Sequence, residues 1–364
     1  MPGNELEDRV RASLEELDRA GLRRHLRAPA GVDLCSNDYL GLANHPLLKQ
    51  RMAEAVCRDG VGSTGSRLLR GQRDGFSQIE RRFAKFKGAE RSLYFSSGYL
   101  ANLAVLTTFP QPGDVIFSDQ LNHASLIDGV RLSHARRVIF RHNDAGELAR
   151  LLTEAGGAGE KFVVVESLFS MQGDRAPLAD YARLCRETGA ALIVDEAHAV
   201  GIYGERGQGL GEDVFVSINT AGKALGVSGA FVAGPEWAIE FLIQRARPFI
   251  FSTAPPPAIV AALEASLDVI EAEPERRARL LELAGYLRTG LRLAGDSQII
   301  PVILGSNDRA VSVAEKLQHD GFDVRAIRPP TVPEGSARLR VSLNFNLSET
   351  ILDRFVDCLC KASS

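Results

Sequence analysis

The sequence has no long hydrophobic run and no marked excess of one charge. Of its 364 residues 45% are hydrophobic, but no apolar run reaches the ~18 residues that a membrane-spanning helix needs. The net charge is −3, so neither a nucleic acid nor an anionic membrane is favoured as a partner. The acidic, polar start MPGNELEDRV lacks the features of a signal or transit peptide. We therefore expect a cytoplasmic protein.

Cysteine is also scarce. The chain has five cysteines, an odd number, and they are scattered. Cys358 and Cys360 are close together, but they fall in a helical pattern with no histidine or second cysteine pair nearby, which does not fit a zinc site. We read all five as thiols in a reducing compartment and expect no metal.

From residue 92 the sequence alternates between strand-like and helix-like segments. Short apolar runs such as SLYF, DVIF, RVIF, FVVVES and ALIV are each followed by a helical pattern, except the last, which leads to DEAH. This alternation predicts a mainly parallel sheet with helices on both faces, an α/β domain. The C-terminal part of the chain shows a smaller α+β pattern. At the N-terminus, an amphipathic helix is predicted at 5–24. We predict an N-terminal helix and arm at 1–45, a large α/β domain at 46–255 and an α+β domain at 256–364.

The stretch from Ala191 to Gly229 holds an aspartate, a histidine and a lysine that could serve one cofactor. Asp195 and His198 fall at or just past the end of a buried strand, where open α/β sheets bind ligands. Thr220 and Lys223 are expected in a turn after the strand at 214–218. Taken alone, Lys223 could be a surface lysine. The DEAH segment also occurs in NTPases, but this sequence has no Walker A motif to hold a triphosphate.

These residue types suit pyridoxal phosphate. A lysine amine can form a Schiff base with this carbonyl cofactor, and a carboxylate such as Asp195 can keep its ring nitrogen protonated. Gly98 and Tyr99 begin a helix directly after a strand, so their free backbone N–H groups could bind the phosphate. Ordinary alternatives stay open: that segment could be a simple βα turn with a serine cap, and His123 could be a core histidine rather than a ring-stacking one.

The chain resembles the α-oxoamine synthases, which are fold-type I pyridoxal-phosphate enzymes, and within them the branch that makes 8-amino-7-oxononanoate for biotin. The resemblance covers nearly the whole chain. It rests on ten ordered segments: SNDYLGL (36–42), GSTGSRLLRG (62–71), SSGYLAN (96–102), NHASL (122–126), HND (142–144), SLFSMQGDRAPL (167–178), DEAH (195–198), TAGKALGVSGA (220–230), FSTAPPP (251–257) and IRPPTVPEGSARLR (327–340).

The resemblance implies roles for individual residues. It makes Lys223 the Schiff-base lysine, Asp195 the partner of the ring nitrogen and His123 the stacking imidazole. The other implied cofactor contacts are His198, Ser170, Gly98, Tyr99, Thr220 and Thr253. Thr253 would reach the phosphate across the interface of a homodimer with shared active sites. The implied substrate contacts are Asn37 and Arg340 for the amino-acid carboxylate, with Arg23, Thr331 and His123.

The implied reaction joins L-alanine to a pimeloyl thioester, on CoA or a carrier protein, and releases CO2 and the free thiol. The main alternative is a relative such as glycine C-acetyltransferase (2-amino-3-oxobutyrate CoA ligase), and a non-catalytic scaffold subunit or a fold-type I aminotransferase is a further one. The segment IRPPTVP favours the pimeloyl branch. The chain departs from the family pattern in a short segment before residue 36, which bears on Arg23, and in a trimmed region at 209–214.

Overall fold

The computed structural model describes residues 4–156 and 159–363, which form two compact units. The first unit comprises the described residues up to Ser36, the short piece Met171–Gly173 and the described residues from Leu281 onward. The second comprises Asn37–Ser170 and Asp174–Leu280. The N-terminal arm and the C-terminal residues thus share one unit, whereas the sequence pattern suggested three successive segments.

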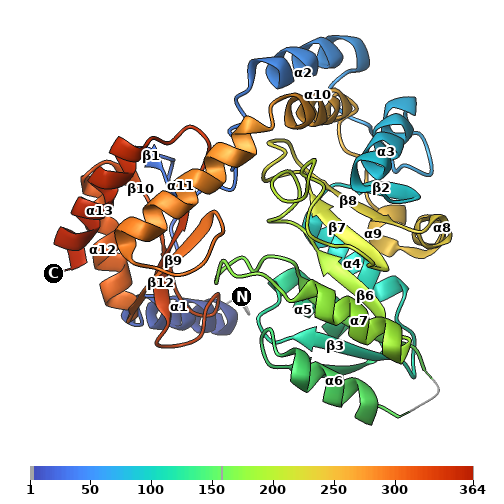
Figure 1. Cartoon of the computed structure of the whole chain (residues 1–364), viewed down its shortest axis with the longest axis horizontal. Helices are drawn as coiled ribbons and strands as arrows, with labels where there is room; N and C mark the ends of the chain where they lie inside the picture. The colour runs from blue at the N-terminus through green and yellow to red at the C-terminus, as the bar shows by residue number, and fades with distance from the viewer. Residues whose placement is uncertain (1–3, 157–158, 364) are drawn as a thin grey trace. The chain divides into compact units, whose positions relative to one another are not determined.

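The second unit is built around a seven-stranded sheet with the order β2-β8-β7-β6-β5-β3-β4 (Figure 1). Its strands are β2 (Arg91–Phe95), β3 (Val115–Asp119), β4 (Arg136–Phe140), β5 (Lys161–Glu166), β6 (Ala191–Asp195), β7 (Val216–Thr220) and β8 (Ala230–Gly234). The strands from β7 to β4 run parallel, and β8 runs antiparallel to both β7 and β2. This mainly parallel sheet confirms the predicted α/β class.

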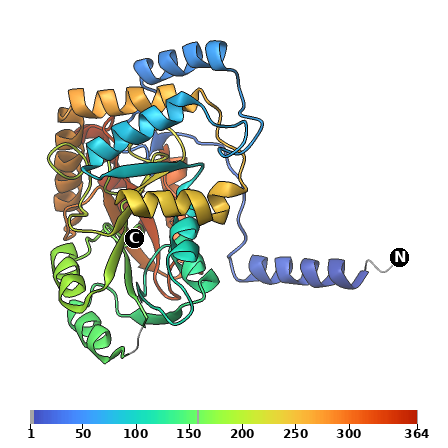
Figure 2. The same ribbon diagram turned by 90° about the vertical axis from the view of Figure 1, so that its right-hand side faces the viewer.

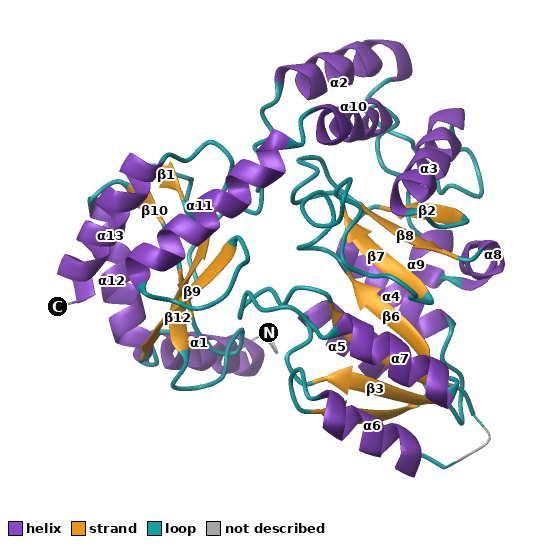
Figure 3. Cartoon of the chain, viewed as in Figure 1, coloured by secondary structure: helices purple, strands orange, loops and turns teal. Residues whose placement is uncertain are grey.

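Helices cover both faces of this sheet, as Figures 2 and 3 show. The helices of the unit are α2 (Pro46–Asp59), α3 (Asp74–Lys87), α4 (Gly98–Thr108), α5 (Ala124–Leu132), α6 (Ala145–Glu154), α7 (Leu178–Thr188), α8 (Glu236–Arg245), α9 (Arg247–Ile250) and α10 (Ile259–Ala272). Because side chains alternate along a strand, Ile193 packs in a core with α4, α5 and α8, whereas Val194 packs in a second core with α6 and α7.

The first unit contains short sheets and the terminal helices. Strands β9 (Ile299–Gly305), β11 (Ala326–Ile327) and β12 (Ala337–Ser342) form an antiparallel sheet, and β1 (Val32–Asp33) pairs with β10 (Phe322–Asp323). The helices of this unit are α1 (Asn4–Arg19), α12 (Asn307–His319) and α13 (Glu349–Ser363), and α11 (Glu275–Leu291) has residues in both units. None of the helices in the described part of the chain is long and apolar enough to cross a bilayer.

Two local predictions need correction. The helix predicted at 5–24 ends at Arg19, and Gly21 then takes a φ of 62°, a backbone conformation that commonly stops helices. Thr220 is the last residue of β7 rather than part of the following turn. It pairs with Ala230 in the antiparallel β7–β8 ladder, a long-range contact that local pattern does not reveal.

Candidate active site

Asp195 ends the central strand β6 and lies in the interior, only 5% exposed. Its Oδ2 accepts a hydrogen bond of 2.7 Å from the Nδ2 of Asn102, and its Oδ1 accepts one of 2.9 Å from the backbone N–H of Ala197. Both donors are neutral, so they hold the carboxylate in place and leave its negative charge for a cationic group.

Lys223 begins a chain of hydrogen bonds that leads to the N-terminal part of the second unit. Its Nζ lies 2.8 Å from Nε2 of His198, and Nδ1 of His198 lies 2.6 Å from the hydroxyl of Tyr39. The Tyr39 hydroxyl in turn donates to Oδ1 of Asn37 over 3.0 Å. When the Lys223 ammonium donates to Nε2, the His198 proton sits on Nδ1 and points to Tyr39. Lys223 and His198, which were both predicted from the sequence, therefore contact each other, as a shared site requires.

The turn that carries Lys223 is closed by its own backbone. The N–H of Ala221 donates to the carbonyl of Gly229, and the N–H of Gly226 donates to the carbonyl of Lys223, each over 2.8 Å. Gly226 has a φ of 67°, and a Cβ there would lie 2.6 Å from atoms of Leu42 and Ala43. Glycine is therefore required at this position, and the amine is presented from a fixed loop.

The N-terminus of α4 lies beside the end of β7. Ser97 caps the helix by accepting the N–H of Leu100, so the N–H groups of Gly98 and Tyr99 are available in the first turn. A Cβ on Gly98 would lie 2.6 Å from Oγ1 of Thr220. A hydroxyl, free backbone N–H groups and the positive end of a helix thus meet at one place, which suits a phosphate.

His123 and Ser170 lie on turns that follow β3 and β5. His123 caps α5, and its Nδ1 lies 2.7 Å from the hydroxyl of Ser125. Burial lowers the pKa of His123, with the charge of Asp195 opposing that shift, so the ring is neutral at pH 7 and suited to stacking. Ser170 is buried, and its N–H donates to the carboxyl group of Glu166 over 3.2 Å.

These groups match the chemistry of pyridoxal phosphate. A buried carboxylate with neutral donors suits a ring nitrogen that carries a proton, and the α4 terminus with Thr220 suits the phosphate. The lysine amine held by His198 suits the aldehyde carbon. The absence of a side chain at Gly98 supports a phosphate at this place, because any Cβ there would fill the space next to the Thr220 hydroxyl.

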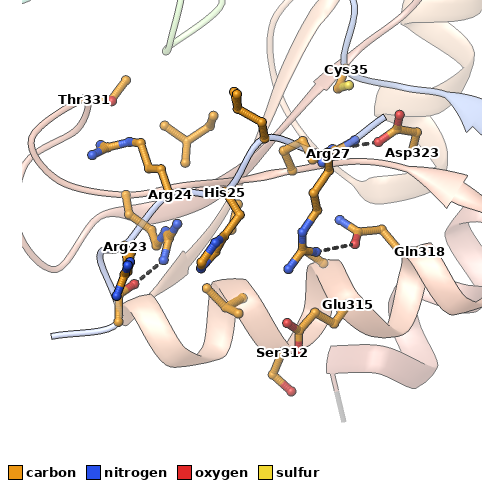
Figure 4. Close-up of a pocket in the computed structure, with 18 of the residues that line it drawn as sticks. Arg23, Arg24, His25, Arg27, Cys35, Ser312, Glu315, Gln318, Asp323 and Thr331 are labelled. Carbon is orange, nitrogen blue, oxygen red and sulfur yellow. Dashed lines mark hydrogen bonds and ion pairs between the residues drawn. The ribbon is translucent and has the colours of Figure 1, made fainter. Parts of the chain in front are cut away.

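The predicted substrate residues Arg23, Thr331 and Arg340 all belong to the first unit. Arg23 and Thr331 line a cavity of about 980 Å³ that also contains Arg24, His25 and Arg27 (Figure 4). Arg23 forms an ion pair with Asp18. Arg340 lies on β12, is only 7% exposed, and donates to the hydroxyl of Ser342 over 2.5 Å. Arg340 is not among the described residues that line this cavity.

Thr253 lies on an exposed loop of the second unit. It forms an isolated β-bridge with Ser66, and the neighbouring N–H of Ala254 donates to the carbonyl of Gly65 over 2.9 Å. Two of the family-like segments, at 62–71 and 251–257, are therefore joined to each other.

Sequence reasoning missed two residues of this site. Asn102 holds Asp195, and Tyr39 holds His198, although both fall within segments that carry the family resemblance. A signal for Asn102 existed, because an amide on an otherwise apolar, buried helix such as α4 needs a partner. Tyr39 gave no comparable signal, since it contacts a residue 159 positions away.

Comparisons with known proteins show the family of the chain and its fold. The family description "aminotransferase class I and II" matches residues 29–359. The 8-amino-7-oxononanoate synthase of Geobacter sulfurreducens is 44% identical over 97% of both chains. A solved 8-amino-7-oxononanoate synthase from Francisella tularensis is 31% identical with a TM-score of 0.79, covering 91% of this chain and 97% of that one. A serine palmitoyltransferase from S. paucimobilis with bound PLP is 28% identical with a TM-score of 0.90, covering 100% and 99%.

The fold and the site define a fold-type I, pyridoxal-phosphate-dependent transferase that acts on small molecules. The chain belongs to the aminotransferase class I and II family and, within it, to the α-oxoamine synthases.

Proposed function

We propose that this enzyme condenses L-alanine with a pimeloyl thioester to give 8-amino-7-oxononanoate, CO2 and the free thiol carrier, a step of biotin synthesis. The observation that carries the proposal is the Lys223–His198 contact in a chain that is 44% identical, over nearly its full length, to an 8-amino-7-oxononanoate synthase. The residue roles below are part of the same proposal.

Lys223 would hold the cofactor covalently and, once alanine has displaced it, would take the proton from the alanine Cα. When bound, pyridoxal phosphate supplies a protonated ring that withdraws electrons from that carbon. Asp195 would keep the ring nitrogen charged, and Asn102 would keep Asp195 oriented. His198, 2.8 Å from the Lys223 amine, would hold the amine in place and exchange protons with it.

The phosphate would be bound by the backbone N–H groups of Gly98 and Tyr99 and by the Thr220 hydroxyl. His123 would stack on the ring, and Ser170 would contact its oxygen together with His198. Arg340 and Asn37 would bind the alanine carboxylate, because a guanidinium can bind a carboxylate through two parallel hydrogen bonds and so fix the direction of the Cα–H bond. Arg23 and Thr331 would contact the acyl substrate.

We also propose a homodimer in which Thr253 contributes to the phosphate site of the partner subunit. The exposed position of Thr253 on its loop supports this role. Sedimentation with and without cofactor would test the dimer. Mixing a Lys223→Ala chain with a Thr253→Ala chain would test the sharing, because hybrid dimers would then contain one intact site.

The decisive experiment measures thiol and CO2 release from alanine, glycine or serine with acyl-CoAs of several chain lengths. Alanine with pimeloyl-CoA is expected to be the fastest pair and to give equal amounts of thiol and CO2. A preference for glycine with acetyl-CoA would instead indicate 2-amino-3-oxobutyrate ligase activity. Amino transfer without CO2 would indicate an aminotransferase. Lys223→Ala should abolish turnover, and an active Lys223→Ala enzyme would contradict the mechanism.

A further inference from the structure

A second carboxyl group lies next to Asp195. Glu166 is the last residue of β5, and in the parallel β5–β6 ladder it is paired directly with Asp195. Side chains at paired positions of neighbouring strands project from the same face of the sheet, whose strands are about 4.8 Å apart. Glu166 is 3% exposed and Asp195 is 5% exposed. Two acidic side chains are therefore neighbours in the interior of the second unit.

The two carboxyl groups have different surroundings. Asp195 accepts hydrogen bonds from Asn102 and from the backbone of Ala197, one to each oxygen. Glu166 accepts the N–H of Ser170 at its Oε2 and is also bonded by the backbone of His123. Its Oε1 has no hydrogen-bond partner among the residues that the structure describes. Glu166 thus contacts the two turns that carry predicted cofactor residues.

Two neighbouring buried carboxylates cannot both be charged without a large energetic cost. Burial and the negative charge of Asp195 raise the pKa of Glu166 to about 8, against the opposing effects of Lys223 and the two backbone N–H groups. Asp195, at the end of the central strand, is the group placed to face a cationic ring. Glu166 therefore holds a proton at neutral pH.

We propose that Glu166 is a protonated positioning residue that ties the His123 and Ser170 turns to the end of β5 and leaves the negative charge to Asp195. This inference rests on the proposed function of the site as a cofactor site. A neutral carboxyl group can accept both backbone N–H groups without competing with Asp195 for the positive charge of the ring. A charged Glu166 would place a second negative charge beside Asp195 and would attract the Lys223 ammonium.

Infrared spectroscopy tests the protonation state directly. In D2O near neutral pH, the protein without cofactor should show the carbonyl band of a protonated carboxylic acid, and Glu166→Gln should lack it. The band of the unaltered protein should also disappear as the pH rises through about 8. Glu196→Gln is the matched control, because Glu196 is fully buried but forms an ion pair with Lys87 at 3.2 Å, and this variant should keep the band. Absence of the band in the unaltered protein at neutral pH would overturn the proposal.

Cofactor binding tests the positioning role. Glu166→Gln keeps a neutral side chain of the same size that can accept both N–H groups, so its dissociation constant for pyridoxal phosphate should stay within about threefold. Glu166→Ala should weaken binding by about tenfold or more, because two buried backbone N–H groups lose their acceptor and one such loss alone costs about tenfold. The cofactor absorbance of the unaltered protein should change with pH as Glu166 loses its proton, and that change should be absent in Glu166→Gln. Equal binding by the Gln and Ala variants, or an unchanged pH profile in Glu166→Gln, would contradict the role.

The same measurements separate this inference from the proposed function. Borohydride reduction of the loaded protein should label Lys223. If Lys223 is not labelled but the infrared band behaves as expected, the cofactor assignment fails and the protonation of Glu166 stands. If Lys223 is labelled and the band is missing, the inference about Glu166 fails and the function stands.

Discussion

The amine of Lys223 lies 2.8 Å from Nε2 of His198, and the same imidazole meets the hydroxyl of Tyr39 at 2.6 Å through Nδ1. His198 is only 4% exposed, and Tyr39 is fully buried. Through His198, the Lys223 amine is therefore linked to a tyrosine that is far away in sequence. This relationship makes Tyr39 a positioning residue for Lys223.

Replacing Tyr39 by Phe should reduce kcat about tenfold. The change removes the hydroxyl that orients His198, and the loss of one buried hydrogen bond costs about 1–1.5 kcal/mol. Steady-state thiol release measures the effect. Tyr181→Phe is the control, because the buried Tyr181 hydroxyl has no hydrogen-bond partner in the described chain. It should leave kcat unchanged. If both variants behave alike, Tyr39 does not act through His198.

Replacing Asn102 by Ala should lower kcat by about ten- to a hundredfold. The variant removes the 2.7 Å donor to Asp195, so the carboxylate loses a bond that favours its charged, correctly oriented form. Steady-state thiol release measures kcat for this variant. Thr107→Ala, on the same helix but bonded only to the carbonyl of Leu103 among described groups, should have no such effect.

Replacing Gly98 by Ala should weaken pyridoxal phosphate binding by at least tenfold. The new Cβ would lie 2.6 Å from the Thr220 hydroxyl, so either the helix start or Thr220 must move away from the phosphate position. Equilibrium titration of the protein with cofactor measures the effect. Gly285→Ala should bind the cofactor normally, because nothing lies within 4 Å of a Cβ built on Gly285. Normal binding by Gly98→Ala would contradict the phosphate site.

His142 should make stability depend on pH in the alkaline range. Burial lowers its pKa, but hydrogen bonds to Asp119 and Asp174 outweigh burial and raise the pKa from 6.5 to about 9. Because the folded state holds this proton more tightly, the stabilisation is complete below pH 6.5 and is lost as the pH rises through about 9. We expect His142 to contribute about 2 kcal/mol to the free energy of unfolding. This is less than the full pKa shift implies, because Asp174 is partly exposed.

Denaturant unfolding of the unaltered protein and of His142→Gln measures this contribution. The difference between the two free energies of unfolding should be about 2 kcal/mol near pH 6 and should approach zero above pH 10. A difference that stays constant across this range would show that His142 contributes through packing against Phe169, whose ring centroid lies 4.4 Å away, and not through its charge.

The sequence alone determined the α/β architecture and the place of most of the candidate cofactor residues. Apolar strand runs alternating with helical patterns gave the mainly parallel sheet, and such strands bring their carboxyl ends to one edge. Asp195 and His198 could therefore be placed at that edge, whereas Thr220 was expected with Lys223 in the turn after the next strand and is instead the last residue of that strand. The resemblance to a known family added substrate residues that periodicity does not identify, and their roles stay predictions.

Only the tertiary structure decided which side chains contact these residues. Asn102 reaches Asp195 across 93 positions, Tyr39 reaches His198 across 159, and Glu166 faces Asp195 because of the β5–β6 register. Periodicity reports which face of an element is buried, because burial depends on local spacing. Hydrogen-bond partners depend instead on strand register and on how distant helices pack, and these are fixed by the whole chain at once.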